Sequence, residues 1–82
     1  MKCSAWIMTP GGLVIDTVEN LEDPAPGKQY ELCVRVRRRT QLGRVLVVFT
    51  GQKPAAGWAE SRLDTAEAGD TVIINLTLEG NA

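Results

Sequence analysis

Residues 29–50 read QYELCVRVRRRTQLGRVLVVFT, and this stretch decides the fold. Its first half alternates apolar with mainly polar residues, which is the period of a β-strand buried on one face; the apolar positions are Tyr30, Leu32, Val34 and Val36. A turn is expected at Gln41–Gly43, after which Arg44–Thr50 continues with hardly a polar interruption. The stretch therefore predicts a long hairpin whose second strand, apolar on both faces, must be covered on both. That strand is either the centre of the domain or part of a contact with another subunit.

Three further strands are predicted on either side of this hairpin. Lys2–Met8 and Leu13–Val18 flank the turn residues Thr9–Gly12, so the N-terminus is expected to form a hairpin of its own. Asn20–Lys28 contains two prolines and a glycine, which predicts a loop outside any ladder. Thr71–Leu78 alternates again and predicts the last strand.

Residues 55–68 permit two interpretations. Their alanine and charged residues favour a helix. Gly57 and the irregular spacing of the apolar residues do not fit an amphipathic helical face. We therefore favour a strand over Trp58–Leu63, followed by a turn at Ala68–Asp70.

The predicted elements define a small all-β fold. Five or six short antiparallel strands separated by turns describe a β-sandwich, jelly-roll-like or immunoglobulin-like, with one short helix in residues 55–68 as the alternative there. A chain of 82 residues makes one domain, so residues 1–82 are assigned to a single β-sandwich. A domain of this size buries only about 60–65% of its unfolded surface, so a partner subunit, a disulfide or a metal would add stability.

Turn and strand residues along much of the chain resemble a known family. Pro26-Gly27-Lys28-Gln29-Tyr30 opens the long strand, a turn at Gly43 precedes Val45–Val48, and Ala68-Gly69-Asp70-Thr71 precedes the last strand. This pattern resembles jelly-roll carbohydrate-binding modules, in which Pro-Gly-x-x-Tyr opens a long strand and a Gly-Asp/Thr turn precedes a late one. Immunoglobulin-like and fibronectin-like sandwiches are similar in this respect. The resemblance implies a sandwich and, through exposed aromatic side chains, a glycan ligand.

The aromatic residues are few, and most are expected in the core. Tyr30 and Phe49 lie on predicted buried faces, and the Tyr30 hydroxyl should reach loop backbone. Both tryptophans are also expected to be buried, with Trp58 closing one end of the sandwich, because large aromatic side chains are mostly buried. The alternative is that Trp58 stays exposed and serves as a contact or a sugar platform, whereas Trp6 belongs to the core.

Charge is distributed unevenly along the chain. The formal net charge of −1 excludes a generally basic nucleic-acid binder and a strongly acidic nucleic-acid mimic. Five arginines gather around the predicted turn, between acidic segments at residues 16–23 and 60–79, namely Arg35, Arg37, Arg38, Arg39 and Arg44. These arginines pair within one molecule or, as a candidate interface together with Trp58, meet acidic residues of another copy. Nucleic-acid binding through the Arg35–Arg44 cluster is a minor alternative.

Catalytic and metal-binding patterns are missing from the sequence. The chain has no histidine, which removes every triad or dyad that uses imidazole. Cys3 and Cys33 are too few for a zinc site, and we expect them to be free, buried thiols, with a disulfide as the alternative. The acidic residues 64–70 lack the calcium-loop pattern. We therefore expect no enzyme activity, no cofactor and no metal.

These observations favour a non-enzymatic structural or assembly module that acts through protein–protein contacts. We expect a homo-oligomer or a larger protein assembly, with a small virion-associated protein of a tailed phage, of the capsid-decoration or tail type, as the setting. A carbohydrate-binding module is the alternative. Met1–Pro10 has no apolar core of a signal peptide, and no stretch is long enough for a transmembrane helix, so production in a cytoplasm is expected, followed by incorporation into the virion if the phage setting holds.

Overall fold

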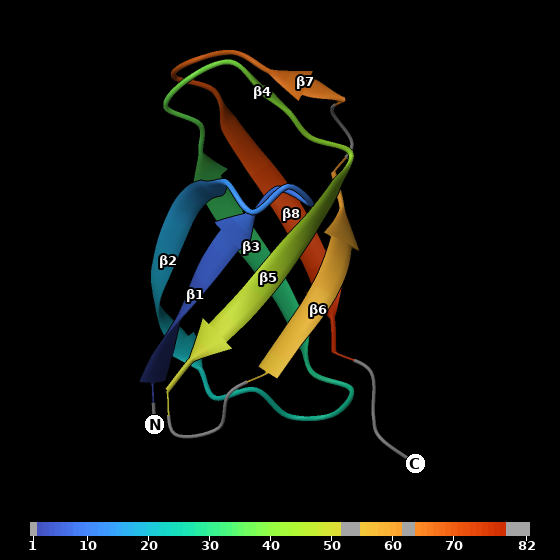
Figure 1. Ribbon diagram of the computed structural model, residues 1–82. Coiled ribbons are helices and arrows are strands. Elements are labelled where there is room, and N and C mark those ends of the chain that lie inside the picture. Colours follow the sequence, from blue (N-terminus) through green and yellow to red (C-terminus); the bar gives the residue numbers. More distant parts are fainter. Residues whose placement is uncertain (1, 52–54, 62–63, 79–82) are drawn as a thin grey trace.

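The computed structural model describes residues 2–51, 55–61 and 64–78, and all regular structure within them is β (Figure 1). Two of the eight strands, β4 and β7, are only two residues long. The strands are β1 Lys2–Met8, β2 Val14–Glu22, β3 Gln29–Arg35, β4 Thr40–Gln41, β5 Arg44–Thr50, β6 Ala55–Glu60, β7 Thr65–Ala66 and β8 Thr71–Thr77.

The strands form two main layers. Sheet A has the order β2-β1-β5-β6, and sheet B consists of β3 and β8. The β4–β7 pair lies across one end of the two layers (Figure 1), and every strand pair is antiparallel. The two layers meet where β2 lies beside β3 and where β6 lies beside β8. The small antiparallel β-sandwich predicted from the sequence is confirmed.

The predicted hairpin over residues 29–50 is wrong, because its two strands belong to different sheets. β3 pairs with β8, whereas β5 lies between β1 and β6. Val36 continues the β3–β8 ladder, since its N–H donates to the Asp70 carbonyl at 2.9 Å and its carbonyl accepts from Gly69 at 2.7 Å. The chain then passes through β4 to Gly43, which has a φ of 86° and redirects it into sheet A. The turn residues thus mark a crossover between layers.

Pairing from β3 to β8 is nested. β5 pairs with β6, β4 with β7, and β3 with β8, so each pair encloses the one before it. The segment from Gln29 to Thr77 is therefore one long antiparallel ribbon that bends over itself. The β1–β2 hairpin, also predicted from the sequence, adds to one side of this ribbon through β5.

The core lies between the sheets and is filled by alternate residues of β1, β3, β5 and β8. The largest side chains that are completely enclosed are Phe49, Ile7, Leu32 and Ile74. The ring of Tyr30 packs at 4.9 Å, centroid to centroid, from that of Phe49. Its hydroxyl group donates to the carbonyl oxygens of Glu22 and Asp23, which lie 2.7 and 3.1 Å away. The expected role of Tyr30 is confirmed, and its hydroxyl ties β3 to the end of β2.

Two strand boundaries differ from the prediction. β2 continues to Glu22, through the first part of the expected loop, and bends at Asn20, where φ is 60°. β6 takes the place of the ambiguous segment, but it covers Ala55–Glu60, and residues 62–63 of the predicted strand lie outside the described residues. Gly57 packs closely on β8, because a Cβ there would lie 3.1 Å from Leu76 Cδ1, and the Leu76 side chain would have to shift by a few tenths of an ångström.

We expect Tyr30→Phe to lower the free energy of unfolding by about 1–2 kcal/mol, because the carbonyls of Glu22 and Asp23 lose their donor. Urea denaturation followed by tryptophan fluorescence measures the change. The matched variant Tyr30→Ala also loses the buried ring and should cost about 3–5 kcal/mol. Equal stability of Tyr30→Phe and the wild type would show that the hydroxyl does not hold β3 to β2.

Candidate functional site

The outer face of sheet A carries a continuous group of apolar side chains. Outward-facing residues of neighbouring strands lie in two rows, because Trp6 pairs with Val48 and Val48 with Ala56, while Met8 pairs with Leu46 and Leu46 with Trp58. We call these six residues the apolar band: Trp6, Met8, Leu46, Val48, Ala56 and Trp58. Val14 on β2 is paired with Met8 and extends the second row.

Both tryptophans belong to the band, so the expectation that they pack in the core is wrong. Trp6 is 47% exposed and Trp58 is 45% exposed. Register is the cause: Ala5 and Ile7 point into the core from β1, and Ala59 does so from β6, so the neighbouring tryptophans point outward. Contiguous exposed groups of large apolar side chains are typical of interaction surfaces, which makes the apolar band the candidate site.

Strand β5 explains why the band exists. Val45, Val47 and Phe49 face the core and are at most 1% exposed. Leu46 and Val48 face outward and are only partly covered. Their largest neighbours on the paired strands are the two tryptophans. The expectation that β5 is covered on both faces is therefore met on the core side alone.

A charged pair borders the band at one end. Arg44 and Glu60 are cross-strand partners on β5 and β6, and both are exposed. The Arg44 guanidinium carbon lies 4.3 Å from the centroid of the Trp58 ring, which is a cation–π contact that covers one side of the ring. Within the described chain, neither residue forms an ion pair with the other or with a third residue.

Polar residues border the other end of the band. Ser4 and Thr50 pair across β1 and β5, and the Thr50 hydroxyl lies 3.3 Å from the Ser4 carbonyl oxygen. Beyond them Lys2 Nζ contacts Glu22 Oε1 at 2.5 Å, and this hydrogen bond together with the Lys2 charge lowers the pKa of Glu22. The band is thus apolar at its centre and polar or charged at both ends.

The five predicted interface arginines do not form one patch. Arg44 lies on the outer face of sheet A, whereas Arg35 ends β3 in sheet B, where its backbone N–H donates to Asp16 Oδ2 at 2.9 Å. The other three lie on the connection between β3 and β4, and Arg39 pairs there with Glu67 at 3.4 Å. The structure therefore brings Trp58 together with Arg44 but not with Arg35 or the arginines at 37–39.

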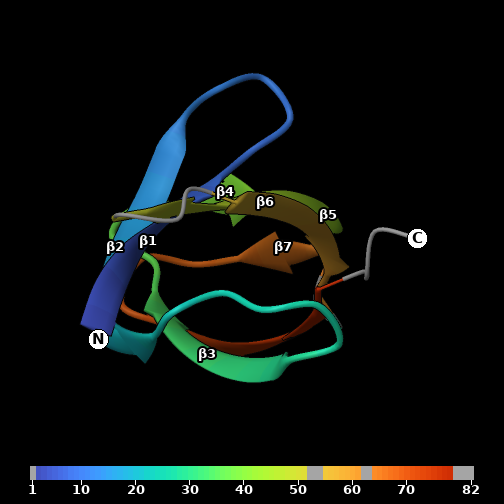
Figure 2. The same cartoon turned by 90° about the horizontal axis from the view of Figure 1, so that it is seen from below.

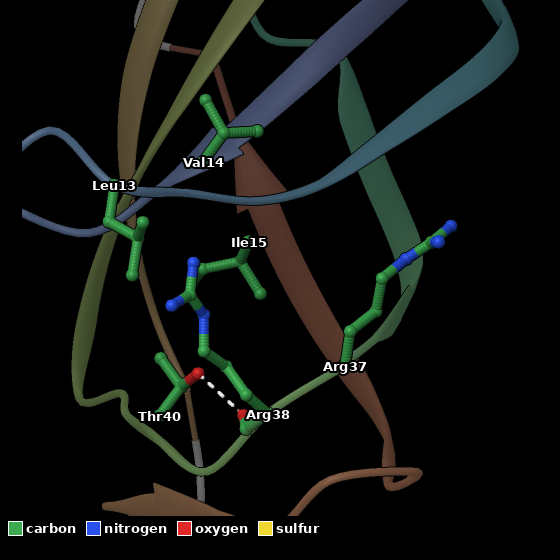
Figure 3. Close-up of a pocket in the computed structure, with 6 residues that line it drawn as sticks. All are labelled: Leu13, Val14, Ile15, Arg37, Arg38 and Thr40. Atoms are coloured by element: carbon green, nitrogen blue, oxygen red, sulfur yellow. Dashed lines mark hydrogen bonds between the residues drawn. The ribbon is translucent and has the colours of Figure 1, made fainter.

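A small pocket lies under the β1–β2 hairpin, close to the arginine connection (Figure 3). Its volume is about 100 Å³, and the Arg38 side chain extends toward Ile15 and Leu13 while Arg37 points away. Thr40 holds the connection by donating its hydroxyl to the Arg38 carbonyl at 2.8 Å. With only one guanidinium directed into it, the pocket does not have the paired cations of a phosphate site, and it is smaller than the roughly 300–1,000 Å³ of ligand pockets.

A broader hollow of about 430 Å³ lies over β3 and β8. Tyr30, Leu76 and the polar residues next to them in sequence line it. Glu31 is the only carboxylate among its lining residues, which otherwise contribute Gln29, Asn75 and Thr77. This set has neither a nucleophile beside a base nor a second acid, so it offers no acid–base pair.

The two cysteines are free and differ in exposure. Cys3 is buried, but Cys33 is exposed on the outer face of sheet B beside Ile73, so the expectation of two buried thiols holds for Cys3 alone. Burial raises the pKa of the Cys3 thiol, with a smaller contribution from the Asp23 charge.

Residues 2–51, 55–61 and 64–78 contain no group of three or more histidine, cysteine, aspartate or glutamate side chains that could hold a metal. In the same ranges no helix has the length and apolar character to cross a membrane.

Comparison with known proteins identifies no relative of the chain. No protein-family model, no curated protein and no solved structure matches it. Sequence reasoning named Trp58 and Arg44 together as candidate interface residues, but it missed Trp6, Leu46 and Val48 as parts of the same surface. The pattern that could have found them is the second apolar face of β5, which needs apolar neighbours on the strands beside it.

We expect the two thiols to differ strongly in reactivity toward iodoacetamide at pH 8. Cys33 is exposed and should react in the native protein, whereas Cys3 should react only on unfolding, because burial both shields it and raises its pKa. Mass spectrometry with and without urea counts the modified thiols, and Cys33→Ser provides the matched control. Rapid modification of Cys3 in the native protein, or a bond between the two sulfurs, would contradict this assignment.

Proposed function

We propose that this chain is a non-enzymatic assembly module that acts through protein–protein contacts, with the apolar band of sheet A as its contact surface. The observation that carries the proposal is the pair of half-exposed tryptophans, Trp6 and Trp58, joined by Leu46 and Val48 into one surface. Protein interfaces combine such an apolar centre with a polar rim, and tryptophan is enriched among the residues that dominate binding.

Covering this surface stabilises a complex because it removes apolar side chains from contact with water. A tryptophan that is about half exposed presents roughly 100 Å² of surface, so covering it is worth about 2.5 kcal/mol. The two tryptophans together would supply about 5 kcal/mol of gross stabilisation, before the entropy of association is subtracted. A partner therefore gains most by packing on the band itself.

The setting that we propose is a repeated assembly, such as the capsid-decoration or tail part of a virion. What supports it is a single small sandwich that presents a group of apolar side chains on the outer face of one sheet. This setting is argued by analogy with the type of protein that fills such positions.

Glycan binding is the second candidate, because two exposed tryptophans on one sheet face could stack on sugar rings. Arg44 covers one side of the Trp58 ring, and the space between the tryptophans is filled by aliphatic side chains instead of hydrogen-bonding groups. These features favour a protein partner over a sugar. Nucleic-acid binding is weaker still, since the arginines from Arg35 to Arg44 lie on different faces.

The proposal predicts that a photo-crosslinking amino acid at Val48 captures protein in the cells that make this chain. The same amino acid at Ile73, which is 45% exposed on the outer face of sheet B, is the matched control. We expect protein adducts from position 48, visible on denaturing gels, and few from position 73. Equal yields at the two positions would overturn the proposal.

A pair of substitutions separates the protein partner from the glycan. Leu46→Lys keeps both tryptophans but places a charge in the middle of the band, so it should remove the adducts at position 48. Trp58→Ala should weaken either kind of binding. Retardation on soluble polysaccharides that survives Leu46→Lys and is lost in Trp58→Ala would support the glycan instead.

A further inference from the structure

We infer that the partner is a second copy of this chain, packed face to face over the β5 and β6 part of the apolar band about a two-fold axis that runs along the strands between β5 and β6. The inference rests on the proposed function and names the partner and its register. In this arrangement each residue of β5 pairs with a β6 residue of its own chain, and it faces the partner's copy of that same β6 residue.

The β1–β2 hairpin decides where a second sheet can approach. Figure 2 shows the connection Thr9–Leu13 rising from sheet A on the side away from sheet B. The turn is well held, because the backbone N–H of Thr9 donates to the Leu13 carbonyl at 2.9 Å and that of Gly12 to the Thr9 carbonyl at 3.0 Å. A partner that approaches this face must accommodate the connection, and β6 and β5 are the strands of sheet A farthest from β2.

The residues of β5 and β6 are complementary under this two-fold rotation. Three cross-strand pairs face outward along the two strands: Arg44 with Glu60, Leu46 with Trp58, and Val48 with Ala56. Exchange by the axis places the ring of Trp58 on the partner's Leu46 and the small Ala56 opposite the partner's Val48. A two-fold interface uses the same patch on both subunits, so it requires this kind of self-complementarity.

Charge fixes the register. Arg44 and Glu60 lie on adjacent strands, yet within the described residues they form no ion pair, and Arg44 rests on Trp58. The two-fold axis brings each Arg44 to the partner's Glu60, which forms two reciprocal ion pairs at the end of the apolar band. Such pairs contribute mainly to orientation and specificity. The net charge of −1 on each chain opposes the association only weakly.

The size of the face predicts a weak, exchanging dimer. With the axis between β5 and β6, these two strands of each sheet overlap. Two strands about 4.8 Å apart, with about seven residues rising 3.3 Å each, give a face of roughly 220 Å² in projection. The two faces bury about 450 Å² in this measure, well below the 1,200–2,000 Å² typical of stable complexes. The dimer should therefore depend on concentration.

Charge reversal tests the inference by sedimentation velocity over a concentration series. Arg44→Glu and Glu60→Arg should each weaken the dimer at least tenfold, because each places like charges in both reciprocal pairs. An equimolar mixture of the two variants should associate again, since every charged contact in the mixed dimer is then between opposite charges. The double variant R44E/E60R should also dimerise, within about threefold of the wild type. Arg37→Glu is the matched control and should change nothing, and thermal melting checks that each variant is folded.

The outcomes separate this inference from the function on which it rests. Recovery of association in the mixture supports the two-fold register. A wild type that stays monomeric at every concentration overturns the second copy as partner, while protein adducts at position 48 would still support the contact function. A dimer that Leu46→Lys abolishes but charge reversal leaves unchanged overturns the register.

Discussion

The constraint on which the rest of the structure depends is the position of β5 in the middle of sheet A. Hydrogen bonds to β1 on one edge and β6 on the other fix its side chains to alternate between two faces. Sheet B covers only one of these faces, where Val45, Val47 and Phe49 complete the core. The apolar residues of the other face are left outside, and the tryptophans on β1 and β6 join them. Exposure of the band is thus a consequence of a sheet with one covering layer.

Local pattern was sufficient for the parts of the fold that depend on alternation. It located the inward faces of β3 and β8, the β1–β2 hairpin and the role of Tyr30, because each follows from neighbouring residues. Strand pairing was not predicted in the same way, since a turn at Gly43 looks the same whether the chain folds back in its own sheet or crosses to the other. The faces of Trp6 and Trp58 were missed because both alternating sets in these strands are largely apolar.

The arginines show how sequence proximity can mislead. Arg35 and Arg44 are close along the chain, but β3 and β5 lie in opposite layers, so the two side chains belong to opposite outer faces. Arg44 instead lies beside Glu60, and the two residues become neighbours only after β5 and β6 have paired. The acidic neighbour of Arg44 could not be chosen from the sequence, because it depends on the strand register.

The nested order of the ribbon has a consequence for how the chain reaches its fold. β5 and β6 are the paired strands closest to each other in sequence, and the strands of the β4–β7 and β3–β8 pairs are progressively farther apart along the chain. Once an inner pair has formed, it shortens the effective loop that the next pair must close, so the entropy of each closure is reduced. Folding can then proceed outward as a zipper that starts at β5 and β6. The strands that carry four of the six residues of the apolar band would be the first to form, and this part of the band would be exposed to water before the core beneath it is complete.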